Sequence, residues 1–148
     1  SDAAAAVVVV TGAADTTEGQ GWWKHQYSGS GAPHIDAAAA EGYLEVVTAV
    51  SSVFSEVAPL ATGGDAHAAL SPTGSDRRPY ARAALLIAWL HFASGAVDVD
   101  ATVPLGGGAV IGYLDLMFAA EEAILAPATT DKELLDLELR LGRARFAT

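Results

Sequence analysis

Cysteine is absent from this chain, and its absence excludes disulfide bonds, thiolate metal sites and a cysteine nucleophile. Basic residues are also few, since 8 Lys and Arg stand against 18 Asp and Glu, which gives a formal net charge of -10. Because such a charge repels a phosphate backbone, we expect neither nucleic acid nor an anionic membrane surface as a partner. No apolar run reaches the roughly 20 residues that cross a bilayer, so we expect no membrane insertion.

The chain does contain enough apolar sequence for one folded domain. It has 148 residues, of which 51% are hydrophobic, and a domain of this size buries about two-thirds of its unfolded surface. The spacing of these residues predicts a mainly α fold, an irregular four-helix bundle over residues 19–148 that follows a strand and linker over residues 1–18. The expected helices cover residues 37–57, 76–94, 108–126 and the stretch after Thr130, with a short helical piece at 65–70.

Two of these helices have informative faces. Residues 83–93 are apolar on nearly all sides, which is typical of a central helix. The helix expected at 108–126 has one apolar face, and its acidic residues predict an opposite face in contact with water. The residues expected on that exposed face are Asp115, Glu121 and Glu122.

Near the N-terminus, four consecutive valines predict a β-strand that is buried on both faces. The backbone groups of a lone strand need hydrogen-bond partners, and no comparable run of β-branched residues follows in the sequence. We therefore expect this strand to pair with another domain or, as a donated strand, with another copy of the chain. The strand-donation candidates are Val7, Val8, Val9 and Val10.

Residues 14–33 are rich in Gly, Ser, Thr and Asp, which predicts an irregular linker. Within it lie residues 19–27, which we call the aromatic segment because two adjacent tryptophans and a tyrosine occur there. Indole rings are costly to leave in water, so packing against the helices is the favoured interpretation. The alternative is a platform for a glycan, a small ligand or a partner protein. Its contact candidates are Trp22, Trp23, Lys24, His25 and Tyr27.

The histidines and acidic pairs predict no strong metal site. The four histidines lie in separate segments, with no two on one helix face. We expect His91 to be a hydrogen-bonded core residue, whereas His25 is the better functional candidate. Asp98 and Asp100 resemble the start of a calcium loop, but the later positions lack the glycine and oxygen ligands that calcium needs. They are weak metal candidates, and we expect no cofactor.

No arrangement typical of an enzyme occurs in the sequence. Glu121 and Glu122 are adjacent and therefore point about 100° apart on a helix, which does not suit paired acid–base work. Residues 106–108 are three glycines before a predicted helix, but no Gly-Lys-Ser/Thr follows them, so a flexible helix start is favoured over a phosphate loop. We expect a protein without catalytic activity.

Two stretches carry a resemblance to a known family. Residues 19–25, Gly-Gln-Gly-Trp-Trp-Lys-His, resemble the Gly-Tyr/Phe-Trp-Lys-Asn/His motif of a helical domain near the C-terminus of large secreted bacterial surface proteins. Residues 85–96 are similar to that family's second signature, a Leu-rich helix that ends in a small residue, Gly and Ala. The resemblance covers residues 19 to about 147. Trp22 stands where the family has Tyr or Phe, and His25-Gln26-Tyr27 replaces its Asn-His-Pro continuation.

This resemblance implies an extracellular or cell-surface location and a preceding immunoglobulin-like β-domain, whose closing strand would be residues 3–11. We therefore expect a non-enzymatic module for anchoring or protein–protein interaction. Its partner would be the rest of a larger surface protein or copies of itself. The alternatives are a subunit of an extracellular filament joined by donation of the valine-rich strand, and glycan or small-ligand binding at Trp22 and Trp23.

Overall fold

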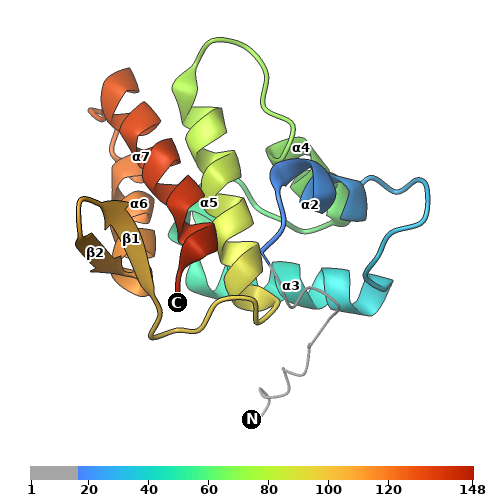
Figure 1. Ribbon diagram of the computed structural model, residues 1–148. Coiled ribbons are helices and arrows are strands. Elements are labelled where there is room, and N and C mark those ends of the chain that lie inside the picture. The colour runs from blue at the N-terminus through green and yellow to red at the C-terminus, as the bar shows by residue number, and fades with distance from the viewer. Residues whose placement is uncertain (1–16) are drawn as a thin grey trace.

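The structure is a computed structural model that describes residues 17–148, so the valine run and its predicted strand lie outside the described residues (Figure 1). The predicted mainly helical fold is confirmed, and within this range six α-helices accompany one small antiparallel sheet of two strands. The elements are α2 (Gln20–Gln26), α3 (Ala37–Val50), the π-helix η1 (Val53–Val57), α4 (Gly63–Ala69), α5 (Arg77–Ala93), β1 (Thr102–Gly106), β2 (Ala109–Gly112), α6 (Tyr113–Leu125), α7 (Asp131–Arg143) and the 3₁₀-helix η2 (Ala144–Phe146).

Helix α5 is the centre of the fold, as its apolar sequence predicts. It packs against α2, α3, α4, α6 and α7, and Leu85, Leu86, Trp89 and Leu90 on it are fully buried. Figure 1 shows α6 and α7 running alongside α5, while α3 crosses below them and α2 and α4 lie on the other side. No helix within residues 17–148 has the length and apolar character to cross a membrane.

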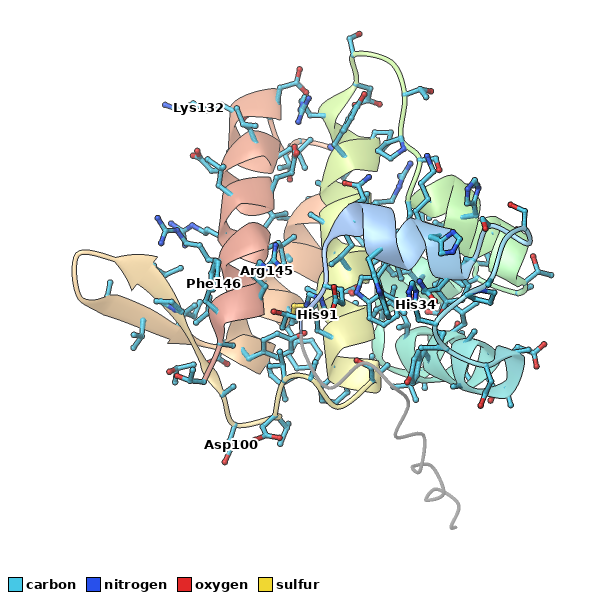
Figure 2. The ribbon with its side chains drawn as sticks, turned by 45° about the vertical axis from the view of Figure 1, so that its right-hand side comes forward. His34, His91, Asp100, Lys132, Arg145 and Phe146 are labelled. Carbon is cyan, nitrogen blue, oxygen red and sulfur yellow. The ribbon has the colours of Figure 1, made fainter. Side chains whose placement is uncertain are left out.

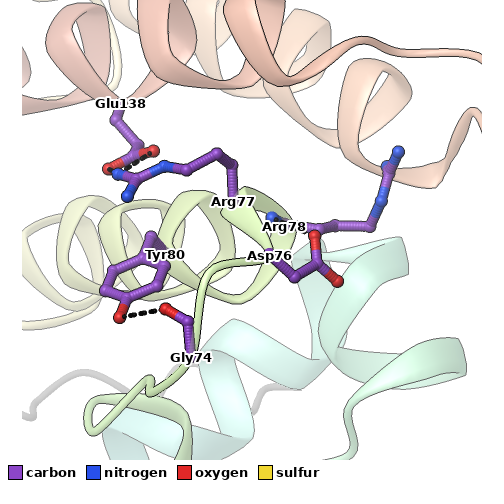
Figure 3. A network of polar contacts seen from close by, with 6 residues as sticks. All are labelled: Gly74, Asp76, Arg77, Arg78, Tyr80 and Glu138. Atoms are coloured by element: carbon purple, nitrogen blue, oxygen red, sulfur yellow. Dashed lines mark hydrogen bonds and ion pairs between the residues drawn. The ribbon is translucent and has the colours of Figure 1, made fainter.

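The N-terminal end of α5 is fastened to α7 by a charged contact (Figure 3). Asp76 caps α5 by accepting the Arg78 backbone N–H at 3.1 Å. The Arg77 guanidinium donates to both carboxylate oxygens of Glu138, at 2.8 and 2.9 Å, and lies over the Tyr80 ring at 4.4 Å. This two-oxygen contact fixes the relative position of the two helices at that end.

The expected helix over residues 37–57 is wrong beyond Val50. Helix α3 ends there, Ser51 adopts an extended conformation with φ -110° and ψ 121°, and the chain re-forms as η1. The break is stabilised by Glu121 of α6, whose carboxylate accepts the Ser51 hydroxyl at 2.6 Å and the Val53 N–H at 2.8 Å.

The prediction that Glu121 lies on an exposed face is therefore also wrong. Its side chain is 6% exposed, and besides the two donors at the α3 break it accepts the indole N–H of Trp89 at 2.7 Å. Asp115 and Glu122, the other two residues expected on that face, are exposed. A carboxylate can be buried here because three donors from α5 and the α3 break replace its water.

The expected helix over residues 108–126 begins five residues late, at Tyr113, because a β-hairpin precedes it. Strands β1 and β2 pair antiparallel around Gly106, Gly107 and Gly108, whose φ angles of 92°, 61° and 84° suit glycine and reverse the chain. The hairpin is joined to the end of the chain, since Thr102 and Thr148 exchange backbone hydrogen bonds of 2.9 and 3.1 Å.

Candidate functional site

The aromatic segment forms a short helix, so the predicted irregular linker is wrong over residues 20–26. Helix α2 begins after Gly19, whose backbone is extended with φ -84° and ψ 176°, and ends at Gln26, with Tyr27 as its C-cap. Lys24 and His25 lie in its last turn, where positive charge interacts favourably with the helix dipole. With only seven residues and flanking glycines, the helix has too short a periodic pattern to stand out in the sequence.

Two of the three rings in the aromatic segment are buried. Trp23 is 0% exposed and Tyr27 is 6% exposed, so neither ring offers an open face to a glycan or small ligand, which was the alternative interpretation of this segment. Trp23 packs edge-to-face against Trp22 at 4.9 Å and against Tyr43 of α3 at 6.1 Å between ring centroids. Trp22 is half-buried and stacks on the imidazole of His34 at 5.7 Å. The packing interpretation therefore describes this segment better.

Gln26 is the polar centre of the segment. It is 7% exposed. Its Oε1 accepts the backbone N–H groups of His34 at 2.6 Å and Ile35 at 3.3 Å, while its Nε2 donates to the Trp22 carbonyl at 2.9 Å. One amide thus closes α2 against the chain that leads into α3. An amide followed by a glycine-rich loop was the only sequence signal for this contact.

Two further side chains connect the segment to other elements. The Tyr27 hydroxyl donates to the Ala40 carbonyl of α3 at 2.9 Å, and Gln20 Nε2 donates to the Leu70 carbonyl after α4 at 2.8 Å. Burial, together with nearby Tyr43, raises the pKa of Tyr27, so this hydroxyl keeps its proton and remains a donor. Side chains of the segment thus fasten it to two helices, α3 and α4.

His91 of α5 meets the chain just before the segment, and the prediction of a hydrogen-bonded core histidine is confirmed. It is 2% exposed, and its Nε2 lies 3.2 Å from the Glu18 N–H and 2.9 Å from the Glu18 carbonyl, so one contact forms in each tautomer. Burial lowers the pKa of His91 to about 4, with a further contribution from the positive charge of Arg145 and opposing contributions from Glu18. Figure 2 shows the buried His91 near Arg145, which is exposed at the surface, whereas His34 lies farther away, beyond the aromatic segment.

Lys24 and His25 are half-buried. The Nε2 atom of His25 lies 3.3 Å from the Ala32 carbonyl, and its ring fills the space beside Gly31, where an added Cβ would come within 3.0 Å of the imidazole. Gly31 also has a φ of 71°, which favours glycine. These contacts assign His25 a packing role in the loop that follows α2.

The two metal candidates do not come together with other ligands. Asp98 and Asp100 are both exposed, and Figure 2 shows Asp100 directed away from the body of the protein. The Asp98 carbonyl accepts the Ala101 N–H at 3.1 Å in a local turn. Within residues 17–148, no group of three or more His, Asp and Glu side chains converges.

A groove of about 270 Å3 lies between α5, α7 and the start of the aromatic segment. Small and apolar residues of α5 and α7 line its floor. Two charged side chains that line it take part in contacts within the fold, since Glu138 pairs with Arg77 at 2.8 Å and the Arg145 guanidinium donates to the Thr17 carbonyl at 3.3 Å. The groove therefore lies where the start of the aromatic segment meets α5 and α7.

No known protein family, curated protein or solved structure matches this chain. Its function must therefore be inferred from its own residues and their contacts.

Proposed function

We propose that this chain is a non-enzymatic module that anchors or joins proteins outside the cell or at the cell surface. In this proposal the four longest helices, α3, α5, α6 and α7, act as an irregular four-helix bundle, and the aromatic segment is the junction through which the chain enters it. The observation that carries the proposal is the number of separate elements to which this segment is fastened.

The fastening spans the whole helical body. Gln26 and Tyr27 bind the chain around the start of α3, Gln20 binds the end of α4, and Glu18 meets α5 at His91. One residue earlier, the Thr17 carbonyl accepts Arg145 Nη2 at 3.3 Å beyond α7. A load applied to the chain before residue 17 would therefore be shared among four helices and two buried rings, which suits a junction between domains.

The location is supported by the resemblance of residues 19–25 and 85–96 to a domain of secreted bacterial surface proteins. Within the first motif, Trp23 is fully buried and packs against Tyr43 of α3, and Gln20 donates to the Leu70 carbonyl after α4. The motif therefore matches a structural requirement of the junction.

A protein partner is supported by apolar side chains on the outer side of α7. Leu135 and Leu139 are 46% and 64% exposed and lie four residues apart, which places them on one face of the helix. Phe146, which follows in η2, is 63% exposed. Exposed apolar side chains that gather on one face are typical of protein contact surfaces.

Pulling the full chain between residues 1 and 148 in a force spectrometer tests the junction. We expect the first rupture to need a clearly lower force after Gln26→Ala, because this change frees the amide contacts to His34, Ile35 and Trp22. Ser51→Ala is the matched control, since it also removes a buried polar side chain but lies at the end of α3.

Ser51→Ala should leave the force of the first rupture unchanged. The proposal fails if the aromatic segment of the unmodified chain detaches without measurable resistance. It also fails if both variants lower the first rupture force equally, because the contacts of the segment would then not resist the applied force.

A further inference from the structure

The β-hairpin has one closed edge and one open edge. On the outer edge of β1, Thr102 exchanges both backbone hydrogen bonds with Thr148, and Pro104 has no N–H to offer. On the other side of the hairpin, β2 lies at the outer margin of the molecule, with β1 between it and the end of α7 (Figure 1). The two edges therefore differ in what they can still bind.

The register shows which groups of β2 face outward. Because Thr102 directs its N–H and carbonyl toward Thr148, its partner Gly112 must direct its backbone groups away from β1, and Val110 two residues earlier does the same. Gly112 is the N-cap of α6, so its carbonyl belongs to that helix. The Val110 N–H and carbonyl and the Gly112 N–H remain open, since no residue of the described chain pairs with them.

Over Ala109, Val110 and Ile111 this edge also lacks the usual protection against strand addition, although the Asp115 carboxylate lies beside Gly112 at its end. Charged side chains, proline or a covering loop normally block an exposed strand edge, but β2 is Ala-Val-Ile-Gly and carries no charge. Val110 is 61% exposed on one face, whereas Ile111 on the other face is half-buried against the core. A strand added here would meet apolar side chains on both of its faces.

The sequence contains a segment that fits these requirements. Residues 7–10 are four valines whose predicted strand is apolar on both faces and needs an external partner. We propose that the open edge of β2 accepts the Val7–Val10 segment of a second copy of this chain as a third strand. This inference rests on the proposed function and deepens it, because it names the partner and the contact surface.

The position of Thr17 favours a second copy over the chain's own segment. Thr17 is bound to Arg145, which lies in η2, and η2 packs against β1. The chain therefore enters the fold on the closed side of the hairpin, and its own valines would have to pass around the hairpin to reach β2. The seven steps from Val10 to Thr17 span at most about 25 Å, so a donated segment would join two copies that lie within this distance.

Sedimentation of the full chain over a concentration series tests this inference. We expect the unmodified chain to rise above its monomer mass of 15.1 kDa as concentration increases. Val110→Pro should remain a monomer, because it removes the outward N–H while Pro104 shows that the hairpin accepts proline at the opposite position. Val110→Lys should have the same effect, and Val57→Lys is its matched control, since Val57 is 53% exposed on a distant element.

Mixing separates a donated strand from other modes of association. Val9→Pro blocks the donor and should also be a monomer, but an equimolar mixture of Val9→Pro and Val110→Pro retains one intact donor and one intact acceptor. This mixture should form dimers and nothing larger, with circular dichroism confirming that each variant is folded.

The inference is overturned if the unmodified chain stays monomeric at every concentration, if Val110→Pro and Val110→Lys associate as the unmodified chain does, or if the mixture yields no dimer. Each of these outcomes would leave the junction unaffected, since the pulling experiment is made on single chains.

Discussion

Trp23 and Trp89 are both 0% exposed, yet they are held in place in different ways. The indole N–H of Trp89 donates to the Glu121 carboxylate at 2.7 Å. The indole N–H of Trp23 is buried, and no residue of the described chain accepts it. The position of Trp89 is thus specified by a directional polar contact, and that of Trp23 by the shape of the rings around it.

This difference between the two tryptophans reflects a difference between the helical body, which contains Trp89, and the junction, which contains Trp23. Around Trp89, one carboxylate connects α6, α5 and the break after α3, so each of these three elements depends on the other two. Near Trp23, the polar contacts are made by its neighbours in the chain. Gln26 accepts the His34 N–H, and the Tyr27 hydroxyl donates to the Ala40 carbonyl. We therefore expect a substitution of Glu121 to destabilise the whole fold, and a substitution of Trp23 to cause a smaller loss of stability.

The largest effect should come from Glu121→Ala. This change leaves the Ser51 hydroxyl, the Val53 N–H and the Trp89 N–H without an acceptor in a buried site, which should lower the free energy of unfolding by about 4 kcal/mol. Urea denaturation followed by circular dichroism measures this loss. Glu122→Ala is the control, because Glu122 is the next residue of the same helix and is exposed. Equal effects of the two changes would contradict the arrangement around Trp89.

The second effect is a loss of stability at acidic pH that arises from His91, which packs beside Trp23. His91, whose ring lies 6.1 Å from that of Trp23, has its pKa lowered by burial from 6.5 to about 4. Above pH 6.5 the histidine is neutral in both states, and its contribution to stability is complete. As the pH falls from 6.5 to about 4, the unfolded chain takes up a proton that the folded chain does not, which should remove roughly 3 kcal/mol.

Urea denaturation at several pH values measures this loss. His91→Gln keeps a side chain that can reach Glu18 but removes the titrating group, so its stability should decline less between pH 6.5 and 4. The loss of stability that remains in His91→Gln would come from protonation of the acidic residues that both proteins contain. If the two proteins lose stability in parallel, His91 does not govern this range.

The features that could be predicted from the sequence are those that local pattern decides. The continuous apolar run of α5 predicts its central place, and the helix after Thr130 begins with the reciprocal contact between Thr130 and Glu133 that their spacing suggests. His91 could be placed in the core because it lies within that apolar run.

The features that could not be predicted depend on partners distant in the sequence. Glu121 is buried because Ser51 and Trp89, 70 and 32 residues away, donate to it, and no residue near Glu121 in the sequence predicts these two donors. The helix predicted at 108–126 includes part of the hairpin because the apolar residues of β2 continue into the apolar face of α6, while three glycines suit a turn as well as a helix start. The seven residues of α2 gave no periodic signal, and its Gln26 acts through backbone groups eight and nine residues later.

The smallest effect should be the difference between two equal substitutions, Trp89→Phe and Trp23→Phe. Both remove the same volume from a fully buried position, so their packing costs should be similar. Trp89→Phe also removes a hydrogen bond to a carboxylate, whereas Trp23→Phe removes an N–H that is buried without an acceptor in the described chain. Trp89→Phe should therefore lower the free energy of unfolding by about 2 kcal/mol more than Trp23→Phe. Urea denaturation of the two variants in parallel measures the difference. Equal losses would mean that the hydrogen bond of Trp89 adds nothing to stability, and that the two tryptophans are held by packing alone.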